Sequence, residues 1–365
     1  MNLNIKNKIE NIILHTTEES EMLYKLKKVI YEADVEQNTA RNSKSMATLI
    51  SENIKQIQDE TQKSSAIKTG FTQLDTNFGG FELGEIVVIG GRPAMGKTQV
   101  LVQLSLQISK TLPVLYFSFD LSEFSLSSRF LSCVSGIAVE KIMQNKLSND
   151  EKQKVASFES NFKYHQLFFN DSCYHSISAF KALCENQIKE NGIKVIVIDY
   201  LQLMGTNKYR HNREYEISYI SRELKNMAKE YKVCILLSSQ LSRALETRSG
   251  SKRPQLSDLR DSGAIEQDAD KVLFVYRPEY YKIEEDDDGE STERRMELIL
   301  AKNRNGVLGT VHLLRDENFT SFQAIDPNKN EFTFSKERLQ ELYDQNPNLK
   351  KLVNDFDLDV DNTPF

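Results

Sequence analysis

Short apolar runs alternate with amphipathic stretches through the middle of the chain. The apolar runs, which we expect to form strands, cover residues 86–89, 113–119, 166–169, 195–198, 233–239, 271–276, 295–300 and 309–314. Helical periodicity follows many of these runs, at residues 100–108, 122–135, 148–161, 179–190 and 215–231. Strands that alternate with helices in this way are typical of an α/β domain with a mostly parallel central sheet.

The two ends of the chain are patterned differently from the middle. Residues 1–45 show mixed helical periodicity and are too few to bury a core of their own, whereas residues 46–65 carry a one-sided apolar stripe. We therefore expect a short α-helical N-terminal segment (1–45), a linker helix (46–65), an α/β domain (66–327), and a C-terminal helix with an acidic tail (328–365). The linker helix either docks on a neighbour through its stripe or stays exposed.

Composition narrows the class of protein. The chain has 365 residues, of which 39% are hydrophobic and 27% charged, and these values fit one α/β domain with appendages. No apolar run approaches the roughly 20 residues that span a membrane, and the N-terminus has no signal-peptide pattern, so we expect a cytoplasmic protein. The 4 cysteines are widely spaced without any C-x-x-C, which favours buried thiols over disulfides or zinc.

Charge does not decide whether the protein binds nucleic acid. The net charge of −6 argues against a uniformly basic coat, because phosphate contacts normally supply most of the affinity for nucleic acid. Acidic residues are concentrated at 284–290, which we interpret as a solvated hairpin tip, and in the last eleven residues. A locally basic channel elsewhere is therefore allowed.

A glycine-rich segment joins the first predicted strand to a predicted helix. Its spacing fits G-x-x-x-x-G-K-[ST], in which backbone N–H groups surround nucleotide phosphates, the lysine reaches the β and γ oxygens, and the hydroxyl binds Mg²⁺. The flanking strand and helix favour this interpretation over a chance glycine-rich turn. The predicted phosphate-binding residues are Gly91, Arg92, Pro93, Ala94, Met95, Gly96, Lys97 and Thr98.

Polar and charged residues follow several later strands. Asp199 ends an apolar strand, as expected of the carboxylate that holds Mg²⁺ in P-loop enzymes, and Gln240 follows the next strand, where an amide could sense the γ-phosphate or the attacking water. Lys302 and Arg304 are two residues apart and would point the same way on one strand. Such a pair is usually solvated, but a pair aimed at a phosphate would form an arginine-finger arrangement.

Long phrases between residues 66 and 326 resemble one family, the DnaB-type hexameric replicative DNA helicases with a RecA-like motor domain. The matching phrases, in chain order, are TGFTQLD, GRPAMGKT, VIVIDYLQLM, EISYISRELKNMAKE, SSQLSRALETR, KRPQLSDLRDSGAIEQDAD and AKNRNGVLGT. The resemblance implies a RecA-like P-loop NTPase fold for residues 66–327, with ATP and Mg²⁺ as cofactors. It also implies a homo-hexameric ring that translocates on single-stranded DNA and unwinds duplex DNA during replication.

The resemblance also implies roles for individual residues. Thr98 and Asp199 match the family's metal ligands, and Gln240 matches its γ-phosphate sensor. Lys302 and Arg304 match finger residues that the family inserts into the neighbouring subunit's nucleotide site.

Further positions match residues near the nucleotide and near DNA. Arg129 matches an arginine that the family places beside the nucleotide. Arg260, Asp261 and Gly263 match the family's single-strand-binding loop, which agrees with the expectation that such a loop binds phosphate without reading bases.

Two departures from the family pattern affect the expected activity. Asp120, in FSFDL, stands where the family has its catalytic glutamate, and Glu123 lies one helical turn further on. A carboxylate withdrawn by one methylene can cost on the order of a hundredfold in rate. The family's N-terminal helical domain of roughly a hundred residues also has no room in 1–45, which we expect to be only a remnant or a replacement of it. A slow or inactive ring subunit that binds DNA or regulates a helicase is therefore the alternative function; a recombinase or signalling ATPase of the same fold matches the phrases less well.

The chain ends in alternating aspartates followed by Pro364 and Phe365. This ending resembles the acidic tip of bacterial single-stranded-DNA-binding proteins, which also ends in Pro-Phe. A polar acidic strip with a terminal aromatic residue suits a pocket with a basic rim. The predicted partners are proteins that bind such tips, and the alternative is an incidental acidic tail.

Overall fold

The structure is a computed structural model, and it describes the chain outside several short gaps and the C-terminal region. The described residues are 3–15, 21–22, 25–26, 28–29, 44–58, 66–171, 176–205, 212–248, 250–286, 289 and 291–325. The predicted C-terminal helix and the acidic tail lie outside them. The chain divides into two units, Met1–Ser64 and Ser65–Phe365.

The first unit contains two described helices, α1 (Leu3–His15) and α3 (Met46–Gln58). The apolar stripe predicted for the linker helix lies on α3 and is exposed in the single chain, with Ile50 at 51% and Ile57 at 75% of their full accessibility. A search of the described helices finds none that is both long and apolar enough to cross a membrane.

The second unit is built on a nine-stranded sheet in the order β3-β2-β4-β5-β1-β6-β7-β8-β9. The first six of these strands run parallel, and β7, β8 and β9 continue the sheet in antiparallel pairs. The strands are β1 (Ile86–Gly91), β2 (Val114–Ser118), β3 (Leu167–Asn170), β4 (Val195–Asp199), β5 (Cys234–Gln240), β6 (Lys271–Tyr276), β7 (Arg295–Asn303), β8 (Gly309–Arg315) and β9 (Phe322–Ala324). The mostly parallel α/β sheet predicted from the sequence is confirmed, and β9 is an addition to it.

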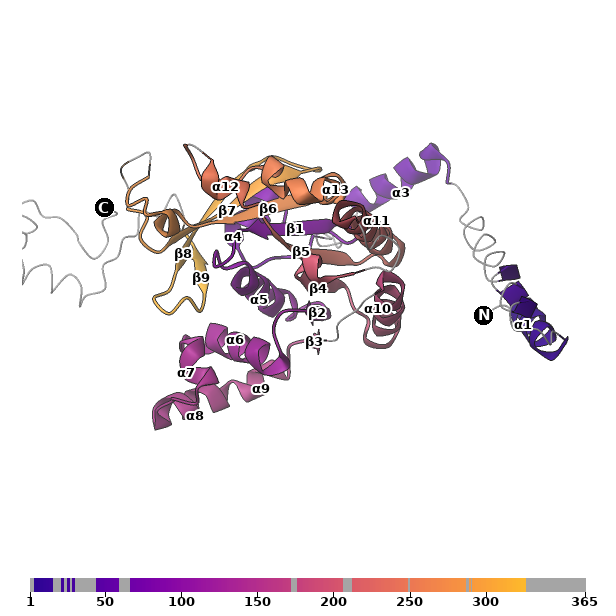
Figure 1. Cartoon of the computed structure of the whole chain (residues 1–365), viewed down its shortest axis with the longest axis horizontal. Coiled ribbons are helices and arrows are strands. Elements are labelled where there is room, and N and C mark those ends of the chain that lie inside the picture. The colour runs from indigo at the N-terminus through magenta and orange to yellow at the C-terminus, as the bar shows by residue number, and fades with distance from the viewer. Residues whose placement is uncertain are drawn as a thin grey trace, which may run out of the picture. The chain divides into compact units, whose positions relative to one another are not determined.

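Helices cover both faces of this sheet, since alternate residues of each central strand are apolar and buried. Val87 and Ile89 of β1 face the helices α5 (Lys97–Ile108) and α6 (Glu123–Ser135). Ile86 and Val88 face α10 (Ile177–Asn191), α11 (Arg213–Tyr231) and α13 (Gly263–Asp268). Figure 1 shows α5 and α11 on opposite sides of the sheet.

The remaining helices of this unit are short. They are α4 (Thr72–Phe78), α7 (Val139–Met143), α8 (Asn149–Ser157), α9 (Glu159–Phe162), α12 (Ala244–Thr247), and the 3₁₀ turns η1 (Leu201–Leu203), η2 (Leu256–Ser262) and η3 (Pro278–Tyr281).

Two predicted boundaries change in the structure. The single helix predicted over 148–161 is broken at Phe158, whose N–H bonds to the carbonyl of Val155 three residues back and so tightens the turn between α8 and α9. Strand β7 extends to Asn303, which places Lys302 inside the strand and Arg304 just beyond its end.

The parallel strands give the sheet two chemically distinct edges. We call the edge where they begin the amino edge and the edge where they end the carboxyl edge. Gly91 of β1 pairs with Gln240 of β5 at the carboxyl edge. Because β7 is antiparallel to β6, its end at Asn303 lies beside Lys271, at the amino edge.

Candidate active site

A phosphate cradle lies at the carboxyl edge, between the end of β1 and the start of α5. The backbone takes left-handed conformations at Ala94 (φ 64°) and Gly96 (φ 99°), and the second would strain a residue with a side chain. A Cβ atom added at Gly91 would lie 3.2 Å from Cγ of Lys97 and 3.3 Å from the carbonyl oxygen of Val275. The loop therefore presents bare backbone beside the N-terminus of α5, where N–H groups lack intrahelical partners.

Lys97, the first residue of α5, carries the cation of this cradle. Its Nζ donates a hydrogen bond to the carbonyl oxygen of Arg92 at 3.1 Å. Burial lowers the pKa of Lys97 to about 8; Asp199 opposes this shift, and the charge of Arg92 adds to it. A partly desolvated ammonium group of this kind is stabilised by a phosphate oxygen.

Asp199 stands at the end of β4 and is 4% exposed. Three hydroxyl groups donate to its carboxylate: Thr98 at 2.8 Å and Tyr116 at 3.1 Å to Oδ2, and Ser238 at 2.6 Å to Oδ1. Burial and the Asp199 charge raise the pKa of Tyr116 well above its ordinary value, so this residue stays a donor. The adjacent hydroxyl of Thr98 and carboxylate of Asp199 are hard oxygen ligands and fit the Mg²⁺ that accompanies a nucleoside triphosphate.

Two glutamines lie next to the cradle. Gln240 ends β5, beside Gly91, and its N–H donates to Oε1 of Gln202 at 3.4 Å. Gln202 also donates from Nε2 to the hydroxyl of Ser239 at 3.0 Å, which orients the end of β5. The sequence indicated Gln240 but not the contact that Gln202 makes with it. The only hint of Gln202 in the sequence is that it is a polar residue within the apolar phrase LQLM after Asp199.

Asp120 lies just beyond β2, at the same edge of the sheet as Asp199. Ser118, two residues before Asp120, pairs with Asp199 in the register of β2 and β4. Asp120 is exposed; burial raises the pKa of Tyr200, and the charge of Asp120 adds to this shift. Among the described residues it has no hydrogen bond or ion pair that fixes it in place. This position leaves the carboxylate free to approach a bound nucleotide.

Two side chains of the predicted cradle point elsewhere. Arg92 is 5% exposed; it donates from Nη1 to the carbonyl oxygen of Leu241 at 2.7 Å and from Nε to Glu246 at 2.8 Å. Met95 is buried in the core. The core and Glu246 occupy these two side chains, so the predicted nucleotide contact of Arg92 and Met95 is one of their backbone N–H groups and stays a prediction.

Arg129 on α6 supplies a second cation near Asp199 and the hydroxyl groups that donate to it. Its charge acts on Tyr116, which donates to Asp199. Its buried Nε has no hydrogen-bond partner in the part of the chain that the structure describes. An arginine with spare donors beside a phosphate cradle is suited to an anionic ligand.

A loop between β8 and β9 covers the P-loop, a contact that no sequence pattern indicates. A Cβ added at Gly96 would lie 3.0 Å from Cζ of Phe319, and the guanidinium of Arg277 lies 4.5 Å from the centre of the same ring. Arg277 also donates to the carbonyl oxygen of Ala94 at 3.1 Å, and Gln99 on α5 donates to the carbonyl of Thr320. These contacts tie the loop between β8 and β9 to the P-loop and to α5.

An ionised glutamate holds this covering loop in place. Burial alone would raise the pKa of Glu279, but hydrogen bonds from Arg315 and Arg277 and from the backbone N–H of Arg294 lower it to about 2. The Arg315 Nε–Glu279 Oε1 distance is 2.9 Å. The two arginines on either side of this carboxylate are those that lie over Phe319.

The predicted finger residues lie at the amino edge, away from the P-loop of the same chain. Lys302 donates from Nζ to the carbonyl oxygen of Glu266 at 2.5 Å, and Arg304 donates to the carbonyl of Gln267. Burial and the nearby charge of Arg304 lower the pKa of Lys302. The structure therefore brings the two cations together as predicted, on the end of α13.

The predicted DNA loop precedes α13. Arg260 and Asp261 fall in η2 and Gly263 begins α13. The side chains of Arg260 and Asp261 lie outside what the structure describes.

The cradle, its buried lysine and the Thr98–Asp199 pair, carried on this mostly parallel sheet, define a P-loop nucleotide-binding protein of RecA-like fold. The sequence model of the family described as "DnaB-like helicase C terminal domain" matches residues 66–324. The chain belongs to this family, so the resemblance identified from the sequence is confirmed.

Individual relatives support this assignment. The chain is 33% identical over 316 residues to "Replicative DNA helicase DnaC" of Bacillus subtilis, with 85% of this chain and 68% of the relative covered. It is 39% identical over 262 residues to "Probable replicative DNA helicase" of Trieres chinensis, with 71% and 57% covered. The chain thus spans between 57% and 68% of the length of these curated relatives.

A solved structure confirms the fold. "The Structure Of A DnaB-Like Replicative Helicase And Its Interactions With Primase" matches with a TM-score of 0.68 and 27% identity, covering 89% of this chain and 76% of that chain.

Proposed function

We propose that this protein is an ATP-hydrolysing DNA helicase that works as a homo-hexameric ring, translocates on single-stranded DNA and unwinds duplex DNA during replication. Family membership and the names of the relatives support this proposal. The geometry of the site supports it independently.

One observation carries the proposal: the two halves of an ATP-hydrolysing site lie on opposite edges of one sheet. Lys97, Thr98 and Asp199 lie at the carboxyl edge, whereas Lys302 and Arg304 lie at the amino edge. The 6 residues of β1 separate these edges by about 20 Å. Arg304 cannot reach the nucleotide of its own chain, so the site is completed by the next subunit. Repetition of such a head-to-tail contact gives a ring when the rotation between subunits closes, and we propose that it closes after six.

Each residue of the carboxyl edge has a definite task in this function. Lys97 binds the β and γ oxygens of ATP, Gln240 contacts the γ-phosphate, and Asp120 orients the attacking water. Thr98 and Asp199 would hold a Mg²⁺, which would supply charge neutralisation at the phosphates. Arg304 of the neighbouring subunit would stabilise the same charge.

The partners follow from the remaining predicted sites. The loop with Arg260 and Gly263 would contact the backbone of single-stranded DNA inside the ring. The tail that ends in Phe365 would dock on proteins that recognise the acidic tip of single-stranded-DNA-binding proteins. We place the protein in the cytoplasm, together with the DNA on which it acts.

Steady-state ATP hydrolysis with and without single-stranded DNA tests the proposal. A helicase motor should hydrolyse ATP faster when single-stranded DNA is added, and Lys97→Ala should hydrolyse ATP under neither condition. Hydrolysis that single-stranded DNA does not stimulate would contradict the proposal and favour the slow or inactive ring subunit.

A further inference from the structure

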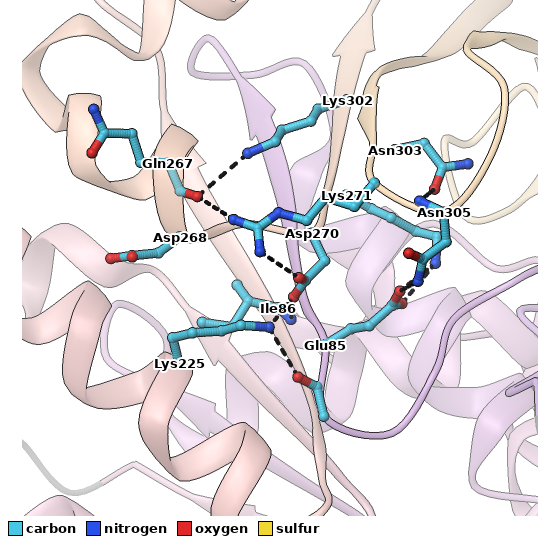
Figure 2. A network of polar contacts seen from close by, with 12 residues as sticks. Glu85, Ile86, Lys225, Gln267, Asp268, Asp270, Lys271, Lys302, Asn303 and Asn305 are labelled. Atoms are coloured by element: carbon cyan, nitrogen blue, oxygen red, sulfur yellow. Dashed lines mark hydrogen bonds and ion pairs between the residues drawn. The ribbon is translucent and has the colours of Figure 1, made fainter. Parts of the chain in front are cut away.

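A polar network gathers at the amino edge around Asp270 (Figure 2). Its carboxylate accepts from the N–H of Ile86 at 2.8 Å, pairs with Lys225, and lies 3.3 Å from Nη1 of Arg304. Lys225 donates further to the carbonyl oxygen of Gly84 at 3.0 Å. The side chains of Asp270 and Lys225 are both 9% exposed, so this anchor is part of the fold.

The two finger cations rest on the C-terminal end of α13, next to this anchor. Lys302 and Arg304 donate to the carbonyl oxygens of Glu266 and Gln267, and Figure 2 shows Lys302 pointing at the end of that helix. The last carbonyls of a helix have no intrahelical partners and attract cations. The backbone N–H of Arg304 also bonds to the carbonyl of Asp270 at 3.0 Å. The pose of both cations therefore depends on where the end of α13 lies.

The other end of α13 begins at the predicted DNA loop. Gly263, the first residue of α13, directly follows η2, which contains Arg260. The helix has 6 residues, so its two ends are only about 9 Å apart. If α13 moves as one rigid body, a displacement of the DNA loop also displaces the carbonyl oxygens of Glu266 and Gln267.

A buried side chain and an ion pair with α11 help to hold α13 in place. Ile265 is 1% exposed and packs in the core. Asp268, at the end of the helix, pairs with Nε of Arg222 on α11 at 3.2 Å. The Arg222 side chain is 67% exposed and that of Asp268 is 10% exposed, so this pair lies at the surface end of α13.

We propose that α13 is the link that couples DNA binding to ATP hydrolysis: single-stranded DNA on the loop before Gly263 sets the position of α13, and the carbonyls at its other end set the position of Lys302 and Arg304. In this account Asp268 and Arg222 are positioning residues. The contacts that hold Arg304 are suited to exchange, because its side chain is 43% exposed and, among the described residues, only the 3.3 Å ion pair with Asp270 binds its charge to a carboxylate. The inference rests on the proposed function, since it assigns a regulation to the same composite site.

Loosening the Arg222–Asp268 pair tests the link. Arg222→Met and Asp268→Asn each remove the pair, and only the second also alters the charge near Lys302. Both variants should lower the ratio of the ATP turnover number with saturating single-stranded DNA to that without DNA by about threefold, the effect expected for one partly exposed ion pair. The DNA-free turnover number, the KM for ATP and the affinity for single-stranded DNA should stay unchanged, and Arg222→Lys should restore most of the ratio.

A matched control lies next to Arg222 on α11. Glu223 pairs with Lys181 of α10 at 2.9 Å, and among the described residues no hydrogen bond or ion pair joins it to α13. Glu223→Gln removes this ion pair from the same helix and should leave the stimulation ratio at the wild-type value.

The possible results separate the inference from the proposed function. An unchanged ratio in Arg222→Met, with a stimulated wild type, overturns the link alone. Weaker DNA binding in both variants overturns it as well, because α13 would then only shape the DNA loop. A lower DNA-free turnover number would show a merely structural role and has the same consequence. A wild-type enzyme that single-stranded DNA does not stimulate overturns the proposed function, and the inference falls with it.

Discussion

Replacing Arg304 by alanine removes the guanidinium group that we place in the nucleotide site of the neighbouring subunit. The structure fixes the expected pattern of rescue because Arg304 lies at the amino edge and Lys97 at the carboxyl edge, separated by the 6 residues of β1 or about 20 Å. Rings of Arg304→Ala should therefore lose about a thousandfold or more in turnover, the usual effect of losing an arginine finger. Rings of Lys97→Ala should be inactive for the opposite reason.

Mixing the two variants should restore activity. In a randomly mixed ring at equal amounts, about one quarter of the interfaces join the intact P-loop of an Arg304→Ala subunit to the intact finger of a Lys97→Ala subunit. The specific ATPase rate should rise to about one quarter of the wild-type rate at the equal ratio and fall toward zero on either side.

The assay is steady-state ATP hydrolysis in the presence of single-stranded DNA over a series of mixing ratios. The matched control mixes wild type with a chain that carries both substitutions, and its rate should fall as the square of the wild-type fraction if subunits exchange. If the rate in this control falls as the square of the wild-type fraction but the test mixture shows no rescue, Arg304 does not act in the nucleotide site of the neighbouring subunit.

Four further predictions concern single residues. Asp120→Asn should abolish hydrolysis without weakening ATP binding and Asp120→Glu should keep or raise the rate, as measured by turnover and nucleotide titration; greater damage from Glu123→Gln would move the role of base to Glu123. A phosphate stabilises the charged form of Lys97 and so raises its pKa from about 8, which means that binding takes up a proton above that pH. The MgATP affinity should thus be constant below about pH 8 and fall by up to about tenfold per unit above it, and a flat profile up to pH 9.5 would count against this. Arg260→Ala should weaken single-stranded DNA binding with little sequence dependence and flatten its salt slope at unchanged ATP affinity; unchanged DNA affinity would place the contact elsewhere. Deleting Phe365 should abolish capture of proteins that bind acidic Pro-Phe tips while ATPase activity is kept, and a faster ATPase instead would indicate that the tail occupies the ring's own channel.

The sequence predicted the sheet and the chemistry at its carboxyl edge because both depend on local patterns. Each core strand is a continuous apolar run, and the order glycine, lysine, threonine in the P-loop is readable without knowledge of any distant contact. The pairing of Thr98 with Asp199 followed from the same logic, since the carboxyl ends of parallel strands share one edge of a sheet.

The features that sequence reasoning missed all depend on contacts between distant segments. The P-loop pattern gave no sign that the Arg92 side chain would pair with Glu246, which lies 154 residues further along the chain. Phe319 covers the P-loop because the β8–β9 loop is pinned to α5, which no pattern near Phe319 indicates. Lys302 and Arg304 lie together as predicted, but the reason was missed: β7 ends at Asn303, and both side chains donate to carbonyl oxygens at the end of α13.

Strand displacement on a forked DNA duplex tests the central claim most directly. The wild-type protein should separate the strands in the presence of ATP and Mg²⁺, and it should fail with a non-hydrolysable ATP analogue. Lys97→Ala should bind the fork without separating it, since the γ-phosphate loses the cation that the P-loop supplies. A wild-type protein that binds the fork and forms rings yet leaves the duplex intact with ATP would contradict the assignment of a helicase.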